Sequence, residues 1–145
     1  MNPNELIHRP KGFKPLASGI EGPEGPALGP DGFMYFVSAD NATILKITHD
    51  GQLSTILTLS GRPNGLAFGN EGEMYIADAG SKSILRYSGK GQPEVYTDNY
   101  DGASFSGPND ICVLEDGSLL FTDPVRLPPP DPSMSPVFKV DTNGI

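Results

Sequence analysis

Three polar residues recur at one position of a repeated pattern. Glu24, Asn64 and Asn109 each stand eight residues before the last glycine of a turn, in "GPDG", "GNEG" and "LEDG". Carboxylate and amide oxygens are hard ligands, which suit Ca²⁺ better than Zn²⁺. The two histidines, His8 and His49, lack the spacing of a zinc site. If the three positions converge, they predict an oxygen-lined site for Ca²⁺, with Mg²⁺ or Zn²⁺ as alternatives.

An Asn that precedes a strand also has a plain structural use, because its side chain caps turns. This alternative applies above all to Asn64, which is followed directly by a glycine. Whether these residues occupy equivalent positions in the fold must therefore be judged from the repeat.

The repeat predicts propeller blades. The three polar residues are spaced by 40 and 45 residues, and each turn glycine is followed by a short apolar segment, "MYF", "MYI" or "LLF". Periods of this length with several short strands are typical of β-propellers. Equivalent residues of a propeller occupy equivalent places, so Glu24, Asn64 and Asn109 are predicted to line one mouth of the central channel. The fold class is all-β, with almost no helix.

The chain of 145 residues holds about three such blades. Residues 1–23 are predicted to form an N-terminal tail or closing strand, and residues 24–145 blades one to three. Three blades cannot close a ring, since propellers typically have four to eight. The third repeat stops before its outer strand. The chain is thus expected to be part of a longer protein; the alternative is a homodimer that closes a three-plus-three ring.

Composition excludes several classes of partner. Ten Lys and Arg against eighteen Asp and Glu give a net charge of −8, which disfavours nucleic acid and anionic membranes. No apolar run is long enough to span a membrane. The first sixteen residues have no apolar core of signal-peptide length, so a cytoplasmic location is expected. The single Cys112 excludes an internal disulfide.

Three stretches resemble the regucalcin/gluconolactonase family, which includes senescence marker protein 30 and luciferin-regenerating enzyme. They are "EGPALGPDGFMYFV" (24–37), "RPNGLAFGNEGEMYIAD" (62–78) and "GPNDICVLEDGSLLFTDP" (107–124). The resemblance implies a six-bladed propeller with one calcium ion in its channel. It makes Glu24 and Asn109 metal ligands, and Asn64 a residue that lines the channel and binds substrate. The family's Trp after Glu-Gly-Pro is Ala27 here, so the pocket wall differs.

The same resemblance implies hydrolysis of a lactone, most simply of a sugar acid. The ion would polarise the ring carbonyl, and a carboxylate would activate water. The family's usual base and two further ligands belong to later blades. Within this chain, Asn109 and Asp110 are therefore the catalytic candidates, and Asp110 alternatively bonds inside its turn or holds a structural ion.

Two loops are predicted to border the site. The proline-rich insertion "PVRLPPPDPSMSP" (124–136) should overhang the channel mouth as a stiff wall, with Arg126 placed to bind substrate. In "YTDNYDGASFSG" (96–107), Tyr100 or Phe105 is expected to line the pocket. Asp78 and Asp123 recur six residues after a turn glycine and are interpreted as turn-forming residues that bind backbone N–H groups.

Other functions remain open at this point. The pattern "PNGLAF" is shared with NHL-like propellers, which are non-catalytic scaffolds for protein binding. Related propellers that hydrolyse organophosphate esters, or act as synthases of the strictosidine type, would share the visible ligands.

Overall fold

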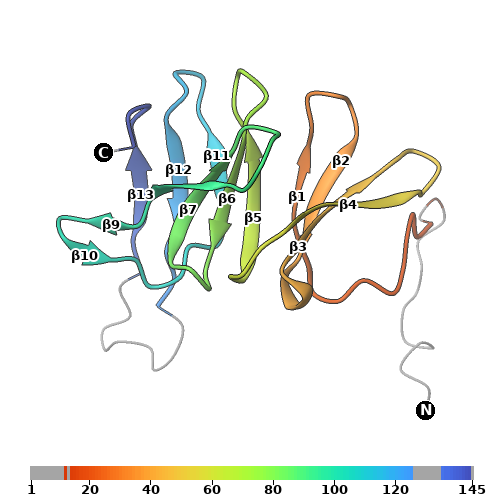
Figure 1. Ribbon diagram of the computed structural model, residues 1–145, viewed down its shortest axis with the longest axis horizontal. Coiled ribbons are helices and arrows are strands. Elements are labelled where there is room, and N and C mark those ends of the chain that lie inside the picture. The colour runs from red at the N-terminus through yellow and green to blue at the C-terminus, as the bar shows by residue number, and fades with distance from the viewer. Residues whose placement is uncertain (1–11, 13, 126–134, 145) are drawn as a thin grey trace, which may run out of the picture.

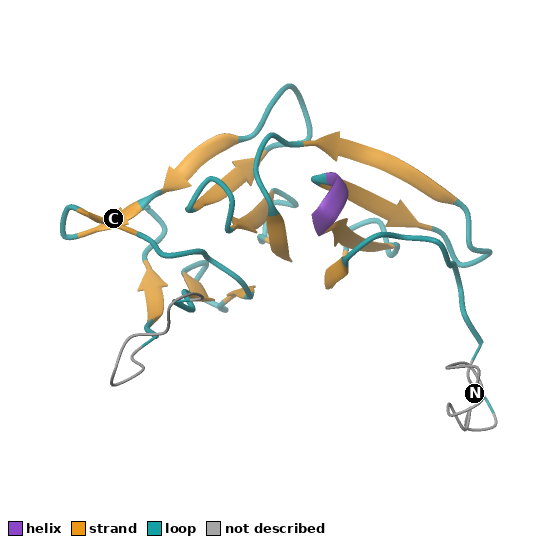
Figure 2. Ribbon diagram, turned by 90° about the horizontal axis from the view of Figure 1, so that it is seen from below, coloured by secondary structure: helices purple, strands orange, loops and turns teal. Residues whose placement is uncertain are grey.

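The computed structural model describes residue 12, residues 14–125 and residues 135–144. They form three antiparallel blade sheets that follow one another in an open arc, and a separate two-stranded hairpin (Figures 1 and 2). The predicted all-β propeller architecture is confirmed. The described chain contains one short 3₁₀ turn, η2 (Ala39–Asn41), and no helix long and apolar enough to cross a membrane.

Each sheet is built in sequence order, from the inner strand outward. The first holds β1 (Pro23–Leu28), β2 (Met34–Ser38), β3 (Thr43–Ile47) and β4 (Leu53–Thr58). The second holds β5 (Pro63–Phe68), β6 (Met74–Asp78), β7 (Ser83–Tyr87) and β8 (Glu94–Thr97). The third has β11 (Ile111–Val113), β12 (Leu119–Thr122) and β13 (Val137–Val140) in the described chain, without a fourth strand, as predicted. A small hairpin, β9 (Asn99–Tyr100) and β10 (Ala103–Ser104), connects the second and third sheets.

The turn glycines account for the repeat seen in the sequence. Gly32, Gly72 and Gly117 have φ angles of 79°, 86° and 82°, in the left-handed region that glycine adopts without steric cost. Each donates its N–H to the residue three positions earlier, which closes the same turn between the first and second strands of every blade. The fixed turn sets the register of the strands on either side, so residues at one offset become equivalent in space.

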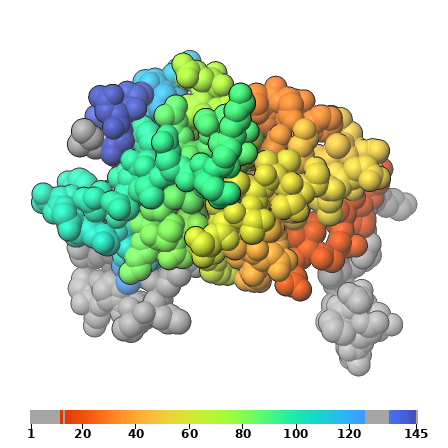
Figure 3. Space-filling view, in the orientation of Figure 1, coloured from red at the N-terminus to blue at the C-terminus, as the bar shows by residue number. Residues whose placement is uncertain are grey.

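The blades pack through two apolar interfaces. Between the first and second blades, Val37 and Ile44 pack with Ile76, and all three are fully buried. Between the second and third blades, Tyr75 packs with Phe121 and their neighbours. Strand β6 is thus covered on both faces, which explains why "MYIAD" lacks the alternation of a half-exposed strand. The space-filling view shows the surfaces of consecutive blades in direct contact (Figure 3).

The innermost strands approach one another more closely than side chains would allow. A Cβ atom at Gly25 would lie well under 3.0 Å from the carbonyl oxygen of Asn64. A Cβ atom at Gly65 would meet the carbonyl oxygen of Asn109 in the same way. Both glycines follow a residue of the repeated polar set, so the absence of a side chain brings β1, β5 and the start of β11 together in succession.

This close approach predicts that Gly65→Ala destabilises the protein. The added methyl group would collide with the backbone of Asn109, which cannot move without displacing the third blade. The free energy of unfolding is expected to fall by roughly 2 kcal/mol or more, measured by urea unfolding.

Gly89→Ala is the control, because a Cβ there meets nothing within 4 Å although its φ is 90°. Its backbone strain should cost about 1 kcal/mol. Equal effects of the two substitutions would contradict the inference that Gly65 is required for blade contact.

The turn of the third blade carries a titratable group with a defined pH dependence. The Ser118 hydroxyl and its N–H both donate to Oδ1 of Asp116, and Lys139 Nζ lies 3.4 Å from Oδ2. These bonds, that from the Ser118 hydroxyl above all, lower the pKa of Asp116 from 3.8 to about 2. Because the folded-state pKa is depressed, the ionised carboxylate contributes stability above pH 4, and this contribution is lost as the pH falls through about 2.

Asp116→Asn should therefore lower the melting temperature at pH 5 but have little effect near pH 2. The measurement is thermal unfolding of both proteins across this range. Glu115→Gln, in the same turn but outside these bonds, serves as the control. A difference between wild type and Asp116→Asn that does not shrink as the pH falls would contradict the assignment.

Candidate functional site

The structure places the three repeated polar residues in succession along the arc, each at the same end of the innermost strand of its blade. Glu24 is the second residue of β1, Asn64 is the second residue of β5, and Asn109 precedes β11 by two residues. The backbone contacts at Gly25 and Gly65 join these three positions from blade to blade. Glu24 is exposed, Asn64 is buried and Asn109 is partly buried. The arrangement forms one polar edge, which we call the channel edge, defined by Glu24, Asn64 and Asn109.

A buried carboxylate holds the segment that leads into β5. Asp78, at the end of β6, is fully buried. Its Oδ1 accepts hydrogen bonds from the backbone N–H groups of Arg62 at 2.7 Å, Gly80 at 2.8 Å and Ser81 at 3.0 Å. Arg62 stands two residues before Asn64, so Asp78 ties the end of β6 to the start of the channel edge.

The third blade repeats this carboxylate contact, and the first blade has a hydroxyl group at the same position. Asp123 accepts from the N–H groups of Ser106 at 2.8 Å and Gly107 at 2.6 Å, just before Asn109. In the first blade Ser38 takes this role with its hydroxyl, which donates to the carbonyl oxygen of Glu21 at 2.6 Å. The prediction that Asp78 and Asp123 bind backbone N–H groups is confirmed. The sequence spacing did not reveal that these N–H groups belong to the segments just before Asn64 and Asn109. The two carboxylates therefore position the channel edge.

Asn109 and Asp110 are held against the end of β12. The Asn109 N–H donates to the Thr122 carbonyl at 2.9 Å, and the Asp110 N–H donates to the Thr122 hydroxyl at 3.0 Å. The side-chain nitrogen of Asn109 lies 3.4 Å from Oδ2 of Asp110, which is exposed. The pair therefore presents an amide and a carboxylate from a rigid backbone beside the channel edge.

Asn64 is oriented by a neighbouring arginine. Arg62 Nη1 donates to Asn64 Oδ1 at 3.2 Å, and Arg62 Nη2 donates to Asp40 Oδ1 at 3.3 Å. Because a guanidinium has only donors, it must face the amide oxygen of Asn64. The amide nitrogen is buried and has no hydrogen-bond partner in the described part of the chain. With its oxygen bonded to Arg62 and its nitrogen buried, Asn64 is less suited to metal ligation than Glu24 or Asn109.

The donor chemistry of the channel edge fits a hard cation. Glu24 offers a carboxylate and Asn109 an amide, the oxygen ligands that Ca²⁺ or Mg²⁺ prefers. Among the described residues no group of three or more His, Cys, Asp or Glu could by itself hold a metal ion. Glu24 and Asn109 thus match such an ion in type and supply part of its ligands.

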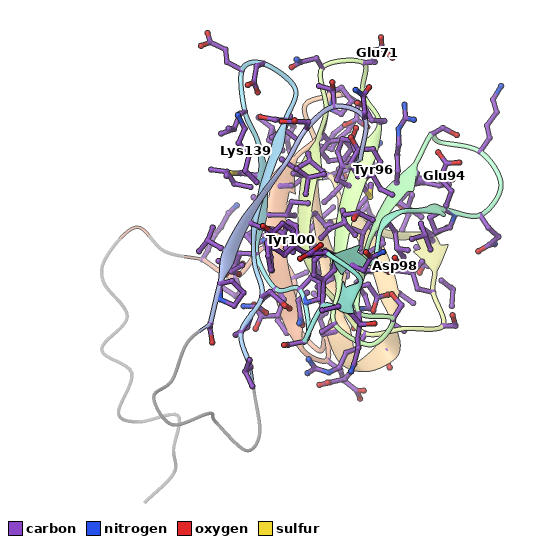
Figure 4. All side chains as sticks on the ribbon, turned by 90° about the vertical axis from the view of Figure 1, so that its left-hand side faces the viewer. Glu71, Glu94, Tyr96, Asp98, Tyr100 and Lys139 are labelled. Atoms are coloured by element: carbon purple, nitrogen blue, oxygen red, sulfur yellow. The ribbon has the colours of Figure 1, made fainter. Side chains whose placement is uncertain are left out.

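Two expected pocket residues lie elsewhere. Phe105 is buried in the core between the second and third blades, so the expectation that it lines the pocket is wrong. Tyr100 lies on the β9–β10 hairpin, and its ring is 5.3 Å from that of Phe138 on β13 (Figure 4). The structure does not bring Tyr100 together with the channel edge, because the hairpin packs beside the outermost described strand of the third blade.

The predicted wall of the site is described only at its base. Arg126 and the insertion from 126 to 134 lie outside the described residues. The flanking Val125 donates its N–H to the Ser135 hydroxyl at 3.1 Å, and the Asp123 N–H donates to the Pro136 carbonyl at 3.0 Å. Both bonds lie at the end of the third blade that also holds Asn109, so the insertion begins and ends beside the channel edge.

Sequence reasoning missed Arg62 and Asp40. Arg62 stands ten residues before a turn glycine, at the offset whose backbone is held by Asp78, and Asp40 belongs to η2 of the preceding blade. An arginine directly before "PNG" was visible in the sequence. Its contact with the first blade depends on how neighbouring blades pack, which no spacing records.

Together these features define a β-propeller of the gluconolactonase type. The chain belongs to the family described as SMP-30/gluconolactonase/LRE-like region, whose model matches residues 22–144. The resemblance noted in the sequence is thereby confirmed. A comparison with curated proteins finds no significant match.

Solved structures show the same relationship. A gluconolactonase from Xanthomonas campestris superposes with a TM-score of 0.80 at 26% identity, over 90% of this chain and 47% of that protein. A putative gluconolactonase gives 0.78 at 27% identity, over 99% of this chain and 54% of that protein. A virginiamycin B lyase from Staphylococcus aureus, at 19% identity and a TM-score of 0.66, shows the fold alone. The chain thus spans about half the length of the gluconolactonases it matches.

The hydrogen bonds that Asp123 accepts from Ser106 and Gly107 lead to a prediction about stability. Asp123→Asn replaces one accepting oxygen by an NH₂ group that faces a backbone N–H donor. The free energy of unfolding should fall by about 2 kcal/mol, the cost of a buried unsatisfied donor, measured by urea unfolding. Asp98→Asn, on the exposed side of the nearby hairpin, should change it by less than about 0.5 kcal/mol. An Asp123→Asn variant with an unchanged free energy of unfolding would show that this carboxylate does not hold the loop.

Proposed function

We propose that the chain contributes Glu24 and Asn109 to a divalent-cation site, Ca²⁺ in the first place, of an enzyme that hydrolyses sugar lactones. One observation carries the proposal. In a chain of this family, the two residues in the matching motifs stand at the same end of the first and third innermost strands, on either side of Asn64. A ligand that is shared by separate blades requires residues at equivalent positions of this kind, which supports the proposal.

The chemistry follows from the residue types. A bound cation would polarise the lactone carbonyl and stabilise negative charge on its oxygen. Glu24 would hold the ion with its exposed carboxylate, and Asn109 with its amide oxygen. Hydrogen bonds from the backbone N–H groups of Asn109 and Asp110 to Thr122 hold the backbone of this part of the site.

Asp110 is the carboxylate best placed in this chain to take a proton from attacking water. It is exposed beside Asn109, and its backbone N–H is fixed by the Thr122 hydroxyl. A base within hydrogen-bond reach of the water gives typically 10²–10⁴-fold of rate. Water that loses its proton to Asp110 would add as hydroxide to the carbonyl carbon. The ring C–O bond would then break, and the proton held by Asp110 would pass to the leaving ring oxygen to give the hydroxy acid. Asn64 and Arg126 are proposed to bind the substrate's remaining oxygens.

The test combines calcium dependence with lactone hydrolysis. Thermal unfolding of the chain in excess Ca²⁺ and in chelator should differ, since a ligand at a hundredfold excess over its dissociation constant stabilises by about 2.7 kcal/mol. Glu24→Gln, which keeps shape but removes charge, should abolish the difference. Release of acid from D-glucono-1,5-lactone, corrected for spontaneous hydrolysis, should be lost in the same variant.

Glu71→Gln is the matched control, an exposed glutamate in the turn at the opposite end of the second blade. It should keep the full effect of calcium. Turnover and melting that respond neither to chelator nor to Glu24→Gln would contradict the proposal and favour a non-catalytic, NHL-like scaffold. Calcium-dependent hydrolysis of organophosphate esters in place of lactones would support the proposed metal site but contradict the proposed substrate.

A further inference from the structure

The two ends of the arc present the two kinds of face with which the blades pack on each other. Each blade has a front face, turned toward the next blade in the sequence, and a back face, turned toward the blade before it. Inside the chain, the front of the first blade packs on the back of the second, and the front of the second packs on the back of the third. The back of the first blade and the front of the third lie at the ends of the arc (Figure 2).

The back face of the first blade has the residues of a blade junction. Its apolar groove is lined by Pro26, Met34, Phe36 and Ile47. Met34 stands two residues after its turn glycine, as Met74 does in the second blade. Met74 is 3% exposed in the first junction, whereas Met34 is 45% exposed. The same side chain at the same position is thus covered inside the arc and uncovered at its end.

The front face of the third blade matches a junction in the same way. Its apolar groove is lined by Cys112, Leu120, Thr122 and Val137. Val137 pairs with Thr122 across the strands, as Ile84 pairs with Ala77 in the second blade. Ile84 is fully buried in the second junction, whereas Val137 is 65% exposed. One molecule therefore carries an open front face and an open back face, each with the pattern that the other kind covers elsewhere in the chain.

We propose that a second copy of this chain covers both faces. The front of the third blade of each copy would pack on the back of the first blade of the other. Because a two-fold axis makes the two new junctions identical, both form together and close a ring of six blades. Six lies within the four to eight blades typical of propellers. The chain covers 47% and 54% of two gluconolactonases, so two copies supply about the length of one such protein.

The new junctions would bring carboxylates from the two copies together. Gly25 lies against the Asn64 carbonyl and Gly65 against the Asn109 carbonyl. Asp110 stands at the next equivalent position, seven residues before its turn glycine. Asp110 of one copy would therefore adjoin Glu24 of the other, and both side chains are exposed in the single chain.

Like charges at this junction oppose closure, and a divalent cation would offset them. Association is therefore expected to be tighter in Ca²⁺. This step rests on the proposed function, and the closed ring would line one channel with two copies each of Glu24 and Asn109.

The test is analytical ultracentrifugation of the chain over a wide range of protein concentration. In chelator, a reversible equilibrium is expected between the chain of 15.4 kDa and a species of twice that mass, without larger species. Excess Ca²⁺ should lower the dissociation constant by about tenfold or more. Asp110→Asn removes one of the opposed charges and should strengthen association in chelator.

An arginine on the front face should prevent association. Val137→Arg would bury an unpaired charge in each junction and should raise the dissociation constant by about a hundredfold or more. Since Val137 is exposed in the single chain, far-UV circular dichroism of the variant should equal that of wild type. Val95→Arg is the matched control, because Val95 is 58% exposed but lies on β8 of the middle blade, away from both ends. It should associate like wild type.

A disulfide can identify which faces meet. In the first junction, Ala27 on the front and Leu66 on the back belong to one apolar cluster. Cys112 and Pro26 stand at the same offsets at the open ends. Mild oxidation of Pro26→Cys should therefore give a covalent dimer, and the double variant Pro26→Cys, Cys112→Ser should give none. A cross-link that persists in the double variant would show that two back faces meet and would overturn the inference.

Two further outcomes would overturn it. One is a chain that stays monomeric at every concentration in both chelator and Ca²⁺, and the other is an open series of species larger than two copies. A monomer whose melting still responds to Ca²⁺ and to Glu24→Gln would leave the proposed metal site standing. A dimer with the expected cross-link but without any response to Ca²⁺ would support the ring and contradict that metal site.

Discussion

The rest of the structure depends on the backbone contact between innermost strands. Gly25 lies against the Asn64 carbonyl and Gly65 against the Asn109 carbonyl, at distances that leave no room for a Cβ atom. These contacts bring residues 40 and 45 positions apart to a single edge. The apolar interfaces farther out then fix the angle between blades, because β6 is buried on both of its faces. The polar site is thus a consequence of how closely three inner strands can approach.

The same contact shows where the repeat changes. Asp110 occupies in the third blade the position that Gly25 and Gly65 occupy in the first two. A segment beside the third blade cannot approach Asp110 as closely as Asn64 approaches Gly25, since the Asp side chain occupies that space. The free faces at the two ends of the arc, which include exposed Leu28 and Val137, are the surfaces that any neighbouring blade would cover.

Two kinds of polar contact hold the channel edge in place. Buried acceptors at the ends of the second strands, Asp78 and Asp123, hold the backbone just before Asn64 and Asn109. They satisfy N–H groups that would otherwise be buried without partners. An exposed layer, Arg62 with Asp40, then orients the Asn64 side chain. A small-molecule site requires side chains held in fixed orientations on a rigid backbone. Asp78 and Asp123 provide the rigid backbone, and Arg62 fixes the orientation of Asn64.

The sequence by itself determined the all-β class, the blade repeat and the equivalence of Glu24, Asn64 and Asn109. These follow from short-range chemistry: glycines with positive φ set each turn, and the turn sets the register. Only the tertiary structure decided that Phe105 belongs to the core, that Tyr100 packs on Phe138, and that Arg62 meets Asp40. Each of these contacts joins residues that are far apart in the sequence. Where such side chains meet is set by the packing of neighbouring blades, and the spacing of residues within one segment does not encode that packing.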